Sequence, residues 1–383
     1  MKKIIIYTLS ISLLSSCVIF SPAELKGRKG KVMDEGTIDC FPIGTLNDEQ
    51  ELLNCELSAA VFYNEKVITA TDKPTPPTSV FSLPYTIDDG FNPEALTYVE
   101  TNALNAVRKI EDFSISPDQQ LIVGVTGFDR VSSSKPEWNA YNSIVYWDSQ
   151  KDTKVKIAHP SKAKTGKEGG NAVIMSSVVL RDKFAAAFKS DNLTVPNYYK
   201  IEGVSIIPGN KMLFGIRELG TSYLEYDYKI LIISADYIFA KSELELSNFR
   251  IAYEFDASTV EGIKQPIGLS SLEYDRFNDR LYMLTSYELN KECENAPEKL
   301  GAYLWVLSME DFNMKNPPQL VMKSRKKPLH LAHKSEAVTV INANTVFIAN
   351  DDDRVVGSEK INDKGNQFFR QPHQGTYYIL RVK

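Results

Sequence analysis

Acidic side chains recur at equivalent places along this 383-residue chain, and they are its best candidates for chemistry. Each lies in a short box of Glu, one or two further residues, and Ser or Thr. The box begins a β-rich segment that ends in a second acid, so the two carboxylates of one segment should lie side by side. Carboxylate oxygens are the ligands that hard cations such as Ca²⁺ prefer. The boxes are Glu56-Leu57-Ser58, Glu111-Asp112-Phe113-Ser114, Glu202-Gly203-Val204-Ser205 and Glu336-Ala337-Val338-Thr339, and in a fifth copy, Ile267-Gly268-Leu269-Ser270, Ile replaces the Glu.

The segment that follows each box has the pattern of a β-hairpin. In the clearest copy, residues 201–218, two β-rich runs flank the turn Pro208-Gly209-Asn210. A third β-rich run follows most hairpins, and a fourth is visible at residues 249–255. Repeated units of four strands are typical of β-propeller blades. The hairpins span residues 56–72, 110–127, 201–218, 267–286 and 335–351, and the third runs span 79–83, 143–148, 229–234, 302–307 and 376–382.

We therefore predict an all-β fold, a β-propeller of five blades, in a single domain spanning residues 39–383. The interval between Glu111 and Glu202 is longer than the others, so a sixth blade or an insertion lies there. Apolar side chains at helical spacing in residues 176–192 favour a helical insertion, with six blades as the alternative. Residues near 40–55 are expected to complete the last blade, because ring closure removes an exposed strand edge.

The inner hairpins of a propeller line its central channel, so the acids should converge at one channel mouth. Such carboxylates repel one another unless positive charge lies among them. A divalent cation, for which we predict Ca²⁺, would supply that charge. The alternative is neutralisation by protein cations beside the acids, namely Lys73, Arg130, Arg217 and Arg354. The predicted metal ligands are Glu56, Asp72, Glu111, Glu202, Glu218, Glu336, Asp351 and Asp352, with the second acids of blades two and four shifted to Asp129 and Glu288.

The first 16 residues have the features of a secretory signal: two Lys, a short apolar stretch, and small residues before Cys17. Leu14-Ser15-Ser16-Cys17 resembles a bacterial lipobox, which implies cleavage before Cys17 and acylation of that residue. Several acyl chains would anchor the protein stably to a membrane. The alternative is an ordinary signal peptide with a chance Cys. Residues 17–38 are predicted to be a flexible tether, and we expect an envelope protein, lipid-anchored to the outer membrane.

The other cysteines, Cys40, Cys55 and Cys293, lie in a compartment that would permit disulfides. A Cys40–Cys55 bridge is one of the possible pairings. The formal net charge of −5 and the lack of a basic tract argue against a nucleic-acid partner. Common hydrolase, nucleotide-binding and zinc motifs do not occur in the sequence.

The stretches YKIEGVSIIPGNKMLFGIRELG and HKSEAVTVINANTVFIANDDD resemble bacterial β-propellers related to the "esterase-like phytase" proteins and to propeller families of unknown function. In that group an IEG box precedes a strand that ends in G-x-R, and an E-[AG]-[LV] box precedes a strand that ends in N-D or D-D. The resemblance covers short patches and implies a propeller. It assigns Glu202, Arg217, Glu336, Asp351 and Asp352 to the channel, whereas Ile267 departs from the pattern.

The leading functional hypothesis is an envelope propeller whose acidic mouth binds a divalent cation and, through it, a ligand. Arg217 and His333 are the candidate ligand contacts, and the small-molecule or protein ligand is not specified by the sequence. A calcium-dependent phosphoester hydrolase is the first alternative, in which Ca²⁺ would clamp phosphate oxygens and activate water. A noncatalytic interaction platform is the second.

Overall fold

The computed structural model describes residues 27–47, 50–132, 134–151, 154–164, 173–190, 194–289, 299–351, 360–361, 367–368 and 370–383. The predicted signal segment, Cys17, Cys293, Asp352 and Arg354 lie outside the described residues. Within the described ranges, no helix has both the length and the apolar character that crossing a bilayer requires.

The chain folds into five successive blades of four or five antiparallel strands, each built from the inside of the molecule outward, and a short parallel pairing of β1 with β20 joins the outer strands of blades four and five. Blade one holds β2 (Leu57–Tyr63), β3 (Lys66–Thr71), β4 (Val80–Thr86), β5 (Gly90–Phe91) and β6 (Thr97–Tyr98). Blade two holds β7 (Ile110–Ile115), β8 (Leu121–Thr126), β9 (Ile144–Asp148) and β10 (Lys156–Ile157). Blade three holds β13 (Tyr198–Ile207), β14 (Lys211–Ser222), β15 (Glu225–Ala240) and β16 (Glu243–Glu254). Blade four holds β17 (Gly268–Asp275), β18 (Arg280–Glu288), β19 (Leu300–Ser308) and β20 (Gln319–Ser324). Blade five holds β23 (Ser335–Asn342), β24 (Thr345–Asn350), β27 (Gln374–Val382) and β1 (Arg28–Asp39).

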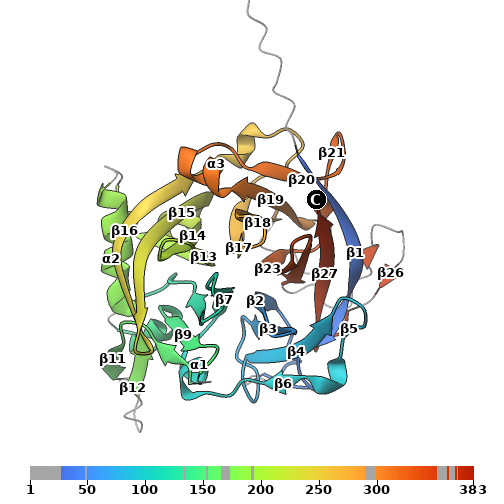
Figure 1. Cartoon of the computed structure of the whole chain (residues 1–383). Helices are drawn as coiled ribbons and strands as arrows, with labels where there is room; N and C mark the ends of the chain where they lie inside the picture. Colours follow the sequence, from blue (N-terminus) through green and yellow to red (C-terminus); the bar gives the residue numbers. More distant parts are fainter. Residues whose placement is uncertain are drawn as a thin grey trace, which may run out of the picture.

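The five sheets stand around a common axis (Figure 1). Their innermost strands contact one another in the closed cycle β2, β7, β13, β17, β23 and back to β2. The protein is therefore an all-β propeller with five blades. All five predicted hairpins and all five predicted third strands are confirmed, and the alternative of six blades is wrong.

The long interval between blades two and three contains an insertion. It includes β11 (Ser161–Lys164), β12 (Val173–Ser176) and helix α2 (Arg181–Ser190), which confirms the predicted helix at residues 176–192. Phe184 of α2 lies with its ring centroid 5.3 Å from that of Phe128 and 5.0 Å from that of Phe214. The helix is thus fixed by aromatic packing at the junction of blades two and three. Short helices α1 (Asn102–Ala106) and α3 (Met309–Met314), and the two-residue strands β21 (Lys327–Pro328), β22 (His330–Leu331), β25 (Lys360–Ile361) and β26 (Gln367–Phe368), complete the fold.

Ring closure differs from the sequence prediction. The outermost strand of blade five is β1, which pairs antiparallel with β27 from Gly30 opposite Val382 to Asp39 opposite Gln374. Residues 40–55 do not form this strand, and residues 28–38 are not a flexible tether. The prediction failed because β1 is an outer strand rich in charged and polar residues, which pairs with β20 only at Arg28 and Lys29, so no hydrophobic alternation marks it.

A disulfide joins Cys40, just after β1, to Cys55, just before β2, with an S–S distance of 1.95 Å. The bridge predicted as one possible pairing is confirmed. It ties the closing strand to the first inner strand, and closing a loop of this length stabilises a fold by about 3 kcal/mol.

Candidate metal centre at the channel mouth

A β-bulge near the start of each inner strand sets the directions of the mouth side chains. The pairing register slips at Glu111 in β7, Glu202 in β13 and Glu336 in β23, so these three Glu residues occupy equivalent bulge positions. In blades one and four the slip falls at Ser58 and Ser270. A bulge inserts one residue and re-aims its side chain. In blades one and four, the residue at the bulge is therefore not the residue that the sequence repeat aligns with Glu111, Glu202 and Glu336.

This shift has two consequences. Glu56 stands two residues before its bulge, at the position that Lys109, Lys200 and Lys334 hold in blades two, three and five. In blade four the residue equivalent to the recurring Glu is Ser270, not Ile267. Sequence reasoning missed the three lysines, although the spacing Lys-x-Glu in three boxes was a readable signal.

The lysines carry ion pairs between neighbouring blades. Lys109 Nζ lies 3.2 Å from Asp72 Oδ2 of blade one and 3.7 Å from Glu111 Oε1. Lys200 Nζ lies 3.5 Å from Glu111 Oε1 of blade two and pairs with Glu202. In blade five, Lys334 Nζ is 2.9 Å from Glu336 Oε1. The predicted cations Lys73 and Arg130 pair with Glu56 and Asp129.

Protein cations lie against the acids of the mouth. Among the described residues, eight carboxylates take part in ion pairs with six cations. Each of these carboxylates therefore has at least one protein cation beside it, as the alternative hypothesis predicts.

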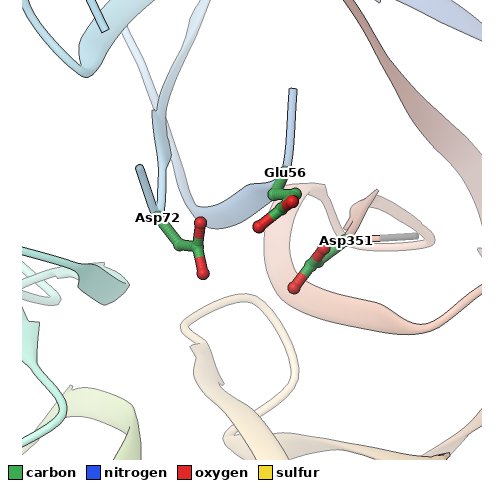
Figure 2. A group of neighbouring side chains, drawn as sticks. All are labelled: Glu56, Asp72 and Asp351. Atoms are coloured by element: carbon green, nitrogen blue, oxygen red, sulfur yellow. The ribbon is translucent and has the colours of Figure 1, made fainter. Parts of the chain in front are cut away.

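Three carboxylates converge where blade five meets blade one. Glu56, Asp72 and Asp351 each place an oxygen within 4.8 Å of the others. Figure 2 shows the three carboxyl groups directed toward one another. The Asp72 side chain is only 9% exposed, and its Oδ1 has no hydrogen-bond partner among the described residues. A buried carboxylate oxygen without a donor is costly, so this geometry suits a cation.

The three carboxyls differ in their proton affinity. Burial raises the pKa of Glu56 well above its usual range, and the charges of Asp72 and Asp351 raise it further. Burial opposes ionisation of Asp72 as well, but Lys109 and a hydrogen bond with Glu56 hold its pKa at about 2. Crowded carboxyls of this kind share protons when no cation is bound.

Arg217 is buried in the wall between blades three and four. Its Nη1 lies 3.1 Å from Glu202 Oε2, donates to Ser286 Oγ at 2.9 Å, and also donates to Ser270. Its guanidinium lies 4.9 Å from the centroid of the Tyr228 ring. Burial opposes the charge of Glu202, yet Arg217 and Lys200 lower the pKa of Glu202 to about 2. Arg217 thus joins two blades.

The remaining candidates lie in separate parts of the structure. Glu218 Oε2 accepts a hydrogen bond from Tyr198 Oη at 2.5 Å, next to Arg217. His333 is buried, with Nδ1 3.3 Å from Thr376 Oγ1 and its ring centroid 5.4 Å from that of Tyr378. It therefore packs against β27 of its own blade.

Comparisons with known proteins do not assign this chain to a family. Neither a family model nor a curated protein matches the chain. A luciferin-regenerating enzyme is 12% identical with a TM-score of 0.37, over 85% of this chain and 79% of that one. A DUF4221 family member from Bacteroides vulgatus is 9% identical with a TM-score of 0.38, over 94% and 99% of the two chains. A gluconolactonase from Xanthomonas campestris is 8% identical with a TM-score of 0.34, over 84% and 70%. These scores assign no function, and the resemblance to the esterase-like phytase group stays a prediction.

Below the mouth, two buried acids that sequence reasoning did not single out join inner strands across the axis. Asp112 Oδ2 accepts hydrogen bonds from Val204 N at 2.9 Å and Leu272 N at 3.2 Å. Glu273 accepts from Thr339 Oγ1 at 3.2 Å and from Ser114 Oγ at 3.4 Å. These contacts link blades two, three, four and five, so side chains occupy the channel beneath the mouth.

Glu273 is expected to make stability depend on pH. Burial raises its pKa to about 8, so the folded state keeps it protonated over a range in which the unfolded chain releases the proton. The stability that protonation supplies is complete below about pH 4.5 and is lost as the pH rises toward 8, by up to about 5 kcal/mol. Glu273→Gln should remove this loss, since Ser114 and Thr339 hydroxyls can accept from an amide.

Urea unfolding at pH 5 and pH 8 checks this prediction. The stability of Glu273→Gln relative to the parent should increase between the two pH values, whereas the exposed control Glu94→Gln should show no such change. A constant difference at both pH values would contradict the assignment.

Proposed function

We propose that the channel mouth binds one divalent cation, Ca²⁺, through Glu56, Asp72 and Asp351. The observation that carries this proposal is the convergence of three carboxylates around the buried Asp72 Oδ1, which has no hydrogen-bond donor among the described residues. Water and a ligand would complete the six to eight oxygens that Ca²⁺ takes.

The position of the triad supports a role in joining blades. Lysines connect blade one to two and blade two to three at the mouth. Arg217 connects blade three to four. At the junction of blades five and one, the three carboxylates converge, and each also pairs with a lysine of its own or a neighbouring blade: Glu56 with Lys73, Asp72 with Lys109 and Asp351 with Lys334. A cation there would link the last blade to the first.

A binding role fits the mouth better than phosphoester hydrolysis. Arg217, the residue that would have to meet a phosphate, is 3% exposed and directs Nη1 toward Glu202, Ser270 and Ser286. We therefore propose a cation-binding propeller that presents its mouth to a ligand, without assigning a reaction.

Calcium titration by calorimetry tests this function. The parent protein should bind one Ca²⁺, and Asp72→Asn and Asp351→Asn should each weaken binding about tenfold or more, because one anionic ligand is lost. Asp129→Asn is the matched control: it removes a buried carboxylate from the same mouth but not from the triad, and should change the Kd by less than about threefold. Equal weakening in all three variants, or no binding by the parent protein, would contradict the proposal.

We also propose that the chain is a lipoprotein of the bacterial envelope, anchored at the outer membrane through acylated Cys17. The lipobox-like segment before Cys17 supports this proposal. Expression in a bacterial host should place the parent protein in the membrane fraction and incorporate an alkyne-labelled fatty acid. Cys17→Ser should lose the label and become soluble in the periplasm. Label on the Cys17→Ser protein, or parent protein found only in soluble fractions, would refute lipidation at Cys17.

A further inference from the structure

The end of the propeller opposite the metal triad has a hollow of about 650 Å³ between blades three and four. The turn at Pro208 and Gly209 between β13 and β14 forms one side, and the start of α3 forms the other. In Figure 1, α3 lies near the outer strands of the same two blades. Ligand pockets commonly have volumes of about 300–1,000 Å³.

The floor of this hollow is apolar. Ile207, Leu213 and Phe312 are buried side chains that line it, and Ile251 and Met309 line it while partly buried. All five belong to or pack near the hydrophobic core between blades three and four. Ile251 and Met309 keep part of their surface in contact with water, and an apolar chain or ring placed there would cover it.

The rim, by contrast, is positively charged. Lys211, Arg250 and Lys315 line the hollow together with one acid, Asp279. Lys211 is paired with Asp236, whereas Arg250 and Lys315 make no ion pair within 4 Å with any described residue. Asp279 Oδ1 accepts a hydrogen bond from Tyr274 Oη at 2.8 Å. Arg250 and Lys315 thus place two positive charges above the apolar floor, although the formal net charge of the whole chain is −5.

We propose that this hollow binds a small amphipathic monoanion, a free medium-chain carboxylate, with the carboxylate at Arg250 and the apolar chain on Ile251 and Met309. The inference is independent of the metal triad. Arg250 presents the planar donor fork that matches a carboxylate, and Lys315 adds positive charge on the opposite rim.

Calorimetric titration with decanoate, below its micelle concentration at pH 7.5, tests the proposal on the mature chain. Decanoate should bind one site, decyltrimethylammonium should bind at least about tenfold more weakly, and Arg250→Gln should weaken decanoate about tenfold. Arg276→Gln, a change of the same kind outside the hollow, should leave the Kd unchanged.

Absence of decanoate binding, equal affinity for the cationic amphiphile, or an unchanged Kd in Arg250→Gln would each overturn the proposal. Co-sedimentation with vesicles of phosphatidylcholine and phosphatidylglycerol distinguishes a lipid surface from a free ligand. Vesicle binding that Arg250→Gln abolishes, without decanoate binding in the parent protein, would reassign the hollow to membrane contact and overturn the free-ligand proposal. The Asp72→Asn variant should bind decanoate normally, so failure of the calcium site does not affect this test.

Discussion

Arg217→Met is expected to lower the free energy of unfolding by about 3–5 kcal/mol, because it leaves the buried Glu202 carboxylate with Lys200 as its one cation and removes the donor to Ser270 and Ser286 of blade four. The Arg217 side chain fills a confined space: a Cβ added at Gly268 would lie 2.7 Å from Arg217 Cγ and 2.8 Å from Tyr228 Cδ1. Methionine has a similar length but cannot donate to Ser270 or Ser286. The loss therefore combines incomplete pairing of a buried charge with broken hydrogen bonds.

Urea unfolding at pH 7 measures this effect. Arg130→Met is the matched control, because Arg130 is 38% exposed and pairs with Asp129 at 2.6 Å near solvent, where an ion pair contributes about 1 kcal/mol or less. Adding Glu202→Gln to Arg217→Met should recover part of the lost stability, since it removes the Glu202 negative charge that the loss of Arg217 leaves incompletely paired. Similar losses in both single variants would show that Arg217 is not specially important to the blade junction.

Removal of β1 is expected to abolish the stable monomeric propeller. A chain that begins at residue 41 would lack the outermost strand of blade five and Cys40, and with Cys40 the disulfide. The freed edge belongs to β27, in which Tyr378, Ile379 and Leu380 are buried. About eight backbone hydrogen bonds at 0.5–1.5 kcal/mol each would be lost, and an unpaired apolar edge recruits other chains.

Size-exclusion chromatography and thermal unfolding compare this truncation with a chain that begins at residue 27. The longer chain should be a monomer with a cooperative transition, and the shorter one should aggregate or unfold at a much lower temperature. The Cys40→Ser, Cys55→Ser double variant of the longer chain separates the disulfide from the strand and should remain monomeric. A monomeric short chain with the melting temperature of that double variant would contradict the role of β1.

The sequence predicts the blades because their inner strands carry strong local signals. Buried β-rich runs flank turns such as Pro208-Gly209-Asn210, and a repeat of such hairpins is typical of a propeller. It does not predict β1, since an outer edge strand needs no apolar face. It also misplaces the blade-four repeat, because the bulge at Ser270, which sets the register, has no distinct sequence signature.

The sequence predicts which types of residue form the candidate site, but it does not predict which charged group each of them contacts. The alternation of acids at strand starts and ends predicts a common mouth, and Glu56, Asp72 and Asp351 do meet there. The same alternation gives no reason to separate these three from Glu111 and Glu202, and acids of both groups pair with lysines. That distinction depends on bulge positions and on packing between blades, which are tertiary properties.

The most direct test of the central claim is an anomalous difference map of crystals grown with Tb³⁺ as a calcium substitute. We expect one strong peak among Glu56, Asp72 and Asp351, with carboxylate oxygens at about 2.3–2.6 Å from it. A mouth without a peak at saturating Tb³⁺, or a single peak at some other group of acids, would contradict the account.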